Sequence, residues 1–297
     1  MQNTTFIPDF KTLARTISLV ENEAEGFEDI IESLTPAPIP LIGFTGPPGA
    51  GKSTLLNAIV SQLLDNGKKI GLLLVDPSSP FNLGALLGDR LRMSTHFNNP
   101  NLFIRSLASR GSLGGLSDKI IEVTEVMRAY PFDYIFIETV GVGQSEVEIA
   151  GLADTTVVIL VPEAGDSIQA MKAGLMEIAD IFVINKADRP EAETMLHALS
   201  TQLHINHREN IPTFKTIAID STGVKELIAA FAQSELFKIN EERKLLLITD
   251  KAYKIIQRNR MKGFDKKRLH DNLQHDYRAE GFNIYRFIKT YLKGSSL

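Results

Sequence analysis

Residues Gly43 to Leu56, with the sequence GFTGPPGAGKSTLL, constrain the fold of this chain more than any other stretch. Within them, Gly46 to Ser53 fit the pattern GxxxxGK[ST], directly after an apolar run and directly before a helical pattern. In this context, glycines let backbone N–H groups converge on a phosphate at the positive end of the helix dipole. The stretch therefore predicts a phosphate-binding loop between a strand and a helix.

The pattern also predicts a role for the polar side chains of the loop. We expect Lys52 to reach the β- and γ-phosphate oxygens, and the Ser53 hydroxyl to be a ligand of Mg²⁺. The alternative is a glycine-rich turn without a ligand, which the flanking strand and helix disfavour. The nucleotide-binding residues predicted here are Gly46, Gly49, Ala50, Gly51, Lys52, Ser53 and Thr54.

Five short apolar runs predict the strands of a sheet. Because they do not alternate apolar with polar residues, each is expected to be buried on both faces, with helices as the cover. A mostly parallel α/β sheet satisfies this pattern, and ligands of such sheets bind beyond the carboxyl ends of the strands. The runs are residues 41–44, 70–75, 134–138, 156–161 and 181–185.

A second motif, NKAD at Asn185 to Asp188, follows the last of these runs and indicates the base. The Asp188 carboxylate can accept hydrogen bonds from guanine N1–H and from the guanine 2-amino group, whereas adenine has an acceptor at N1 and no 2-amino group. Such a site rejects the analogue that leaves its polar group unpaired. We therefore expect GTP and GDP, with Lys186 along the base plane and Asn185 joining this loop to the phosphate-binding loop. An ordinary turn at a strand end is the alternative.

Two carboxylates lie between these motifs at predicted strand ends. Asp76 ends the run LLLVD, and Glu138 ends the run YIFIE, three residues before Gly141. Glu138 occupies the position at which many GTPases have the aspartate of a DxxG motif, and Gly141 is predicted to bind the nucleotide. We expect both carboxylates to point at Mg²⁺ and its waters beside Ser53. A helix N-cap or a turn residue is the alternative for either carboxylate.

Several longer segments occur in the order typical of one known family. After GPPGAGKST come VDPSSPFNLGALLGDRLRM, FIRSLASRGSLGG, ETVGVGQSE, EAGDSIQAMKAG and NKAD. Over residues 10–225 the chain resembles the MeaB/ArgK family of P-loop GTPases, which includes the human methylmalonic aciduria type A protein. Where the family has an SA-type base loop, this chain has AIDSTG at residues 218–223, and it has EAGD where the family commonly has GAGD.

The resemblance implies a fold and a function. The fold is a P-loop NTPase with a SIMIBI-like G domain, a mostly parallel central sheet with helices on both faces, and helical extensions at both termini. Because no glutamine or arginine is evidently placed by the sequence for fast hydrolysis, we expect a low intrinsic rate of GTP hydrolysis. The function that the resemblance implies is that of a homodimeric G-protein chaperone. Its partner is an adenosylcobalamin-dependent acyl-CoA mutase of the methylmalonyl-CoA mutase type, for which it gates cofactor loading and gives protection from inactivation.

The resemblance also assigns switch segments and residues. The first switch is Asp76 to Arg92, the second is Glu138 to Glu146, and the third is Glu163 to Gly174, which reports the nucleotide state to the partner. A solvated helix lysine is the alternative for Lys172 in the third switch. Gln144 and Arg110 are further candidates for promoting hydrolysis. The catalytic residues are then Lys52, Glu138, Asp76 and Lys172, and the metal ligands are Ser53, Asp76, Asp89 and Glu138.

Composition bounds the remaining possibilities. The 297 residues contain no cysteine, which excludes disulfides and thiolate metal sites. No secretory signal is evident, and no apolar stretch approaches the roughly 18 residues of a membrane-spanning helix. We expect a cytoplasmic protein without a membrane or nucleic-acid partner. A metallochaperone-type GTPase and a small-molecule kinase of the same P-loop class are the alternatives, although metal ligands and an acceptor pocket are not evident from the sequence.

Charge and motif positions suggest three parts. Residues 1–39 form an N-terminal helical extension, 40–235 the P-loop GTPase domain, and 236–297 a C-terminal helical extension that serves dimerisation. From Lys238 to Leu297 there are 15 Lys/Arg against 7 Asp/Glu, although the whole chain carries a net charge of −4. The basic tail is interpreted as solvated helical faces that complement the acidic body of a neighbouring subunit.

Overall fold

A computed structural model describes nine stretches of the chain. They are residues 7–76, 94–96, 98–108, 119–139, 148–162, 173–232, 241–261, 264–278 and 281–294. The chain divides into two compact units, Met1–Lys251 and Ala252–Leu297.

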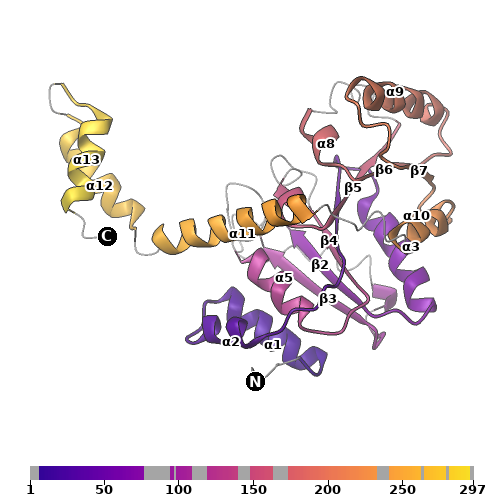
Figure 1. Ribbon diagram of the computed structural model, residues 1–297, viewed down its shortest axis with the longest axis horizontal. Coiled ribbons are helices and arrows are strands. Elements are labelled where there is room, and N and C mark those ends of the chain that lie inside the picture. Colours follow the sequence, from indigo (N-terminus) through magenta and orange to yellow (C-terminus); the bar gives the residue numbers. More distant parts are fainter. Residues whose placement is uncertain are drawn as a thin grey trace. The chain divides into compact units, whose positions relative to one another are not determined.

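A seven-stranded sheet forms the centre of the first unit (Figure 1). Its strand order is β3-β2-β4-β1-β5-β6-β7, and each pair of neighbours is parallel. The predicted parallel α/β fold is therefore confirmed. The strands are β1 (Leu41–Thr45), β2 (Ile70–Asp76), β3 (Leu102–Ala108), β4 (Tyr134–Glu138), β5 (Thr155–Leu160), β6 (Ile181–Asn185) and β7 (Thr213–Thr216).

The five predicted runs correspond to the five inner strands, whereas the two edge strands were not predicted. β3 has the sequence LFIRSLA, and β7 has the sequence TFKT. Both contain polar residues, because an edge strand has only one neighbour in the sheet and its side chains are less completely covered by helices.

Helices cover both faces of the sheet (Figure 1). On one face, α3 (Lys52–Asp65) and α10 (Val224–Ala232) share an apolar core with alternate strand residues such as Val157 and Ile159. On the other face, α8 (Ala173–Ile178) and α9 (Ala192–Ile205) pack on the intervening residues, among them Val158 and Leu160. Successive side chains of β5 thus point to opposite faces, as strand geometry requires.

Two N-terminal helices belong to the first unit. α1 (Phe10–Glu21) begins at Asp9, whose carboxylate accepts a hydrogen bond of 2.7 Å from the Thr12 N–H. Its buried side chains are Leu13, Thr16, Ile17 and Val20, a spacing that places them on one face of the helix. α1 contacts both α2 (Phe27–Ser33) and α5 (Ile120–Arg128). The N-terminal extension is therefore part of the core of the first unit.

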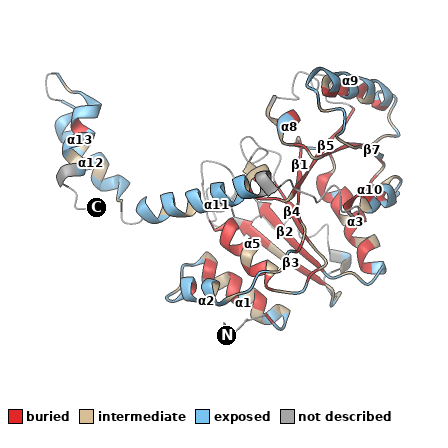
Figure 2. Cartoon of the chain, viewed as in Figure 1, coloured by how far each residue is buried: buried red, intermediate tan, exposed pale blue. Residues whose placement is uncertain are grey.

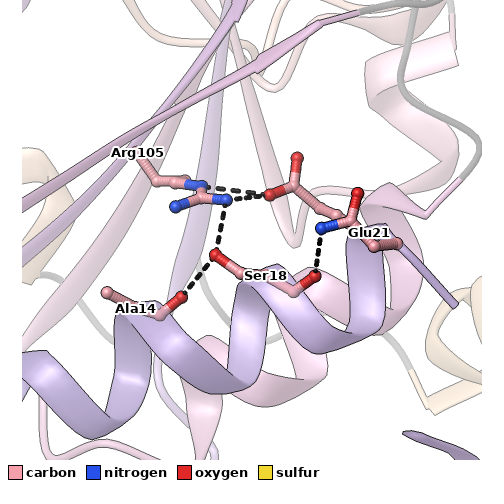
Figure 3. Close-up of polar contacts among 5 residues, drawn as sticks. Ala14, Ser18, Glu21 and Arg105 are labelled. Atoms are coloured by element: carbon pink, nitrogen blue, oxygen red, sulfur yellow. Dashed lines mark hydrogen bonds and ion pairs between the residues drawn. The ribbon is translucent and has the colours of Figure 1, made fainter. Parts of the chain in front are cut away.

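An arginine of the edge strand β3 holds α1 in place (Figure 3). The Arg105 guanidinium forms an ion pair with Glu21 and donates a hydrogen bond of 3.1 Å to Ser18 Oγ. The Ser18 hydroxyl in turn donates to the Ala14 carbonyl at 2.9 Å. Phe10 adds aromatic contacts to Phe103 of β3 at a centroid distance of 5.4 Å.

The C-terminal part is helical. α11 (Glu241–Met261) begins in the first unit and ends in the second, which contains α12 (Lys266–Asp276) and α13 (Ile284–Gly294). Figure 2 shows that most described residues of these three helices are exposed. Aromatic contacts hold the second unit together, including Phe264 with Tyr291 at 5.9 Å and Phe282 with Phe287 at 6.3 Å. None of the helices in the described residues has the length and apolar character needed to span a membrane.

Candidate functional site

The predicted motifs gather at the carboxyl edge of the sheet. The phosphate-binding loop follows β1, Glu138 ends β4, and the NKAD motif begins at the end of β6. Because the strands are parallel, their carboxyl ends lie at one edge. In the register of β1 with β4, Phe44 pairs with Glu138, so the loop that follows Thr45 begins beside this carboxylate.

Two glycines of the phosphate-binding loop combine a positive φ with a close approach to a neighbouring residue. Gly46 has φ +143°, and a Cβ there would overlap the backbone carbonyl oxygen of Ile159 in β5. Gly51 has φ +83°, and its Cβ would overlap the amide nitrogen of Asn185. The left-handed conformation and the close approach both require glycine. The loop is thus packed against β5 and against the first residue of the NKAD motif.

Lys52 and Ser53 form the first turn of α3, which begins directly after Gly51. The Lys52 ammonium donates hydrogen bonds to the carbonyl oxygens of Gly46 at 2.9 Å and Pro47 at 3.1 Å, so it lies across the loop. Lys52 is buried, with 8% of the residue exposed. The α3 helix has 14 residues, and the positive end of its dipole lies at this loop.

The structure brings Ser53 and Glu138 together. The Ser53 hydroxyl donates a hydrogen bond of 2.6 Å to Glu138 Oε1, and both residues are buried. A hydroxyl and a carboxylate are the hard oxygen donors that Mg²⁺ prefers, and Mg²⁺ keeps several waters when it binds protein. These two side chains therefore fit the magnesium site that the sequence predicts.

Two threonines join the ends of β1 and β4 and were not among the predicted site residues. The backbone N–H of Thr139 donates to the Phe44 carbonyl at 3.1 Å, and its hydroxyl donates to Thr45 Oγ1 at 3.2 Å. Both threonines are buried. In the sequence, the signal for each is a threonine at or directly after the end of an apolar run, and this signal is too common to identify a site. Thr45 and Thr139 fix the start of the phosphate-binding loop relative to Glu138.

Asn185 connects three segments of the site. Its side-chain amide donates a hydrogen bond of 2.9 Å to the Ala50 carbonyl in the phosphate-binding loop. Its side-chain oxygen accepts hydrogen bonds from the Thr216 hydroxyl at 3.1 Å and from the Ala218 N–H at 3.2 Å. The predicted connection between the NKAD motif and the phosphate-binding loop is confirmed. The contacts to Thr216 and Ala218 show that the loop after β7 belongs to the same site.

The rest of the NKAD motif forms a fixed turn. Lys186 has φ +56°, and the Ala187 N–H donates to the Thr216 carbonyl at 3.0 Å. Asn185 is 1% exposed, whereas Asp188 is exposed to solvent. A buried asparagine thus anchors the turn, and the predicted base-reading carboxylate faces solvent.

Several predicted residues lie outside the described residues. They are Asp89, Gly141 and Lys172, together with the hydrolysis candidates Gln144 and Arg110. For Asp76, the backbone is described and the side chain is not. Asp76 is the last residue of β2, and β2 pairs directly with β4. Leu74 lies opposite Glu138 in this pairing, so the Asp76 backbone lies two residues beyond Glu138 on the neighbouring strand, at the same edge of the sheet.

Comparison with known proteins identifies relatives of this chain. A family model described as the methylmalonyl-CoA mutase-associated GTPase MeaB matches residues 13–254. A putative GTPase of Pyrococcus abyssi is 48% identical over 227 residues, which cover 74% of this chain and 70% of the relative. The GTPase ArgK of Escherichia coli is 33% identical over 287 residues, which cover 92% of this chain and 84% of ArgK.

A solved structure has the same fold. The protein described as the LAO/AO transport system kinase aligns with a TM-score of 0.65 and 27% sequence identity. The alignment covers 97% of this chain and 88% of that protein.

Proposed function

This chain belongs to the MeaB family of methylmalonyl-CoA mutase-associated GTPases, and on that premise we propose that it binds GTP and GDP with Mg²⁺, hydrolyses GTP, and acts in the cytoplasm. The observation that carries the proposal is the position of Asn185. Its hydrogen bonds to Ala50 and Ala218 join the phosphate-binding loop, the NKAD motif and the loop after β7 in one site. Such a site has a phosphate-binding end and a base-binding end.

Each end has residues for its task. At the phosphate end, backbone N–H groups from Gly49 to Thr54 cradle the β-phosphate, and Lys52 directs its ammonium to the β- and γ-oxygens. At the base end, Asp188 accepts hydrogen bonds from guanine, and the Lys186 stem lies along the ring.

In this class of enzyme, GTP hydrolysis depends on positioning of the reacting groups and on stabilisation of the negative charge on the phosphate oxygens. In this role, Ser53 and Glu138 would hold Mg²⁺ and its waters, with Asp76 and Asp89 as further ligands. The ion would neutralise charge that develops on the phosphate oxygens. Lys52 would stabilise the same charge. The proposal includes a low intrinsic rate of GTP hydrolysis, which a partner protein raises.

We further propose that the chain is a homodimeric G-protein chaperone of an adenosylcobalamin-dependent acyl-CoA mutase. The description of the matched family supports this partner. The chaperone gates cofactor loading and protects the mutase, and the third switch, with Lys172, transmits the nucleotide state to it.

An Asp188→Asn variant tests the base assignment. The asparagine amide donates where xanthine presents a carbonyl in place of the guanine 2-amino group, so we expect weaker GTP binding and tighter XTP binding. Competition calorimetry with GTP, XTP and ATP measures the change. A wild-type chain that prefers ATP would overturn the assignment to GTP.

Steady-state phosphate release, with and without the mutase encoded by the same genome, tests the partner. We expect the mutase to raise the GTPase rate, and the Lys172→Ala variant to lose the increase while it keeps basal nucleotide binding. The absence of a complex with any cobalamin-dependent mutase would refute the chaperone role and leave the GTPase role standing.

A further inference from the structure

A closed ring of covalent bonds and hydrogen bonds joins the phosphate-binding loop to Glu138. Lys52 and Ser53 are adjacent in the chain, and each makes one link of the ring. The Lys52 ammonium donates to the Gly46 carbonyl at 2.9 Å, and the Ser53 hydroxyl donates to Glu138 Oε1 at 2.6 Å. The ring closes through the residue before Gly46 and the residue after Glu138, which are both threonines.

The two threonines make the third link of the ring, directly beyond the paired parts of β1 and β4. The last pair in register between these strands is Phe44 and Glu138. The Thr139 hydroxyl lies 3.2 Å from Thr45 Oγ1 and 3.3 Å from the Phe44 carbonyl oxygen. Thr45 is fully buried and Thr139 is 1% exposed. The threonine link therefore lies inside the protein, where a hydrogen bond is stronger than in water.

The hydroxyl contact adds a constraint that the backbone of β4 does not supply. The Thr139 N–H donates to the Phe44 carbonyl at 3.1 Å, which holds the end of β4 against β1 without any side chain. Thr45, by contrast, is the residue from which the phosphate-binding loop departs. Because Gly46 is fixed by Lys52, a displacement of Glu138 away from the loop has to stretch the contact between the two threonines.

We propose that Thr45 and Thr139 are positioning residues for the metal, because they hold the Glu138 carboxylate where it and the Ser53 hydroxyl can bind the same Mg²⁺. The inference rests on the proposed function, and it gives a task within that function to two residues outside the predicted metal ligands. Groups behind the ligands of a metal site commonly act in this way, since they orient the side chains that bind the ion. Of the three links, only this one contains no predicted ligand of phosphate or metal, so it can be removed while every ligand stays.

This role predicts a loss of affinity that depends on Mg²⁺. Valine has a shape close to that of threonine and no hydroxyl, so Thr139→Val removes the link and leaves the Glu138 carboxylate in the chain. Nucleotide binding without Mg²⁺ depends on the backbone N–H groups of the loop and on Lys52, which the variant keeps. General damage to the loop would instead weaken binding with and without Mg²⁺ alike.

Calorimetry of the full chain with GTP, in Mg²⁺ and in EDTA, tests the proposal. Thr139→Val removes the donor hydroxyl, Thr139→Ser keeps it, and Thr45→Val removes the acceptor on the loop side. Thr124→Val is the matched control. Thr124 is also fully buried, and its hydroxyl donates to the Ile121 carbonyl at 2.7 Å within α5. The control thus removes a buried hydroxyl and its hydrogen bond at a position outside the ring.

We expect Thr139→Val to raise the Kd for GTP in Mg²⁺ about tenfold, the lower end of the range for a group behind a metal ligand. In EDTA its Kd should stay within about twofold of the wild type. Thr45→Val should cause a similar Mg²⁺-dependent loss, and Thr139→Ser should recover most of the affinity. Thr124→Val should keep the wild-type ratio of the Kd values in EDTA and in Mg²⁺.

A double variant with Thr45→Val and Thr139→Val should lose no more affinity than either single variant, because each hydroxyl acts through the other. Losses that multiply in the double variant would overturn the proposal, and so would equal losses in Mg²⁺ and in EDTA. An unchanged Kd in a folded Thr139→Val variant would overturn it as well, and Thr45→Val gives the same decision if Thr139→Val does not fold. A wild type that binds GTP equally well in Mg²⁺ and in EDTA would refute the proposed metal site itself.

Discussion

At the scale of single residues, the pair Ser53 and Glu138 combines a hydroxyl with a buried carboxylate in the candidate site. Its hydrogen bond of 2.6 Å joins the first turn of α3 to the end of β4, and both side chains are buried. A buried carboxylate is costly unless hydrogen bonds or a cation stabilise it. This cost explains why a serine hydroxyl from the phosphate-binding loop is directed at Glu138, and why a divalent cation fits beside it.

The variant Glu138→Gln keeps the shape of the side chain and removes its negative charge. The glutamine amide oxygen can still accept the hydrogen bond from Ser53. We expect the affinity for GTP in the presence of Mg²⁺ to fall about 10- to 100-fold, the range typical for loss of a partner in a metal site. Without Mg²⁺ the affinity should change little.

Calorimetry with GTP, in Mg²⁺ and in EDTA, measures this effect. Asp133→Asn is the control, because Asp133 precedes β4 at the opposite edge and forms an ion pair with Lys68. Equal Mg²⁺ dependence in Glu138→Gln and the wild type would remove Glu138 from the metal site.

At the scale of elements, the two ends of α3 differ in what surrounds their glycines. Gly51 precedes the helix with φ +83°, and Gly67 follows it with φ +71°. A Cβ at Gly51 would overlap the Asn185 amide, whereas a Cβ at Gly67 meets nothing within 4 Å. Both glycines therefore have a positive φ, but only Gly51 also lies in close contact with another residue. At Gly67 the positive φ serves only to reverse the chain.

The free energies of unfolding of the variants Gly51→Ala and Gly67→Ala test this difference in surroundings. We expect Gly67→Ala to lower the free energy of unfolding by about 1 kcal/mol, the strain of a left-handed alanine. Gly51→Ala should lower it by about 2–4 kcal/mol, because Asn185 must also move. Urea unfolding and nucleotide titration distinguish the two, since only Gly51→Ala should weaken GDP binding. Equal losses of stability would show that Asn185 can adjust freely.

A second element-scale contact is the attachment of α1 to β3 through Arg105 and Glu21. The Glu21 side chain is 12% exposed and that of Arg105 is 25% exposed, whereas the surface pair Lys68 and Asp133 is 45% and 35% exposed. Water screens the inner pair less, and Ser18 fixes the guanidinium.

A double-mutant cycle on Arg105→Gln and Glu21→Gln should give a coupling energy of about 1–2 kcal/mol in the free energy of unfolding. The matched cycle on Lys68→Gln and Asp133→Asn should give less than about 1 kcal/mol. Chemical unfolding monitored by circular dichroism provides both values. A larger coupling for the surface pair would contradict the proposed attachment of α1.

At the scale of the whole molecule, charge and apolar surface are unevenly distributed. The basic tail from Lys238 to Leu297 belongs to a chain with a net charge of −4. In α13, Ile284, Ile288 and Leu292 follow one another at intervals of four residues and are 53%, 42% and 47% exposed. Residues at this spacing share one face of a helix. An exposed apolar stripe of this kind is consistent with the proposed homodimer, in which a second copy covers it.

The Ile288→Asp variant tests self-association. We expect the full-length wild type to sediment at twice its mass of 32.9 kDa, and Ile288→Asp to sediment as a monomer, because a charge would be buried in the interface. Thr290→Asp places the same charge on the other side of α13 and should remain dimeric. Analytical ultracentrifugation over a range of concentrations decides between these outcomes. A wild type that is monomeric throughout would refute the homodimer.

Local sequence patterns predicted the parallel fold, a glycine-rich loop between β1 and α3, and a motif that begins at the end of β6. These depend on local signals: an apolar run buried on both faces, glycines at fixed spacing, and a motif at a strand end. The edge strands β3 and β7 were not predicted, because their polar residues interrupt the apolar runs. Those residues are tolerated because each strand lies at an edge of the sheet, and a local pattern does not show which strand lies at an edge.

Which of these residues contact one another depends on the tertiary structure. Ser53 and Glu138 are 85 residues apart in the chain, and Asn185 and Ala50 are 135 apart, yet each pair shares a hydrogen bond. The partners of such a bond depend on strand order and register, which packing of the whole sheet sets.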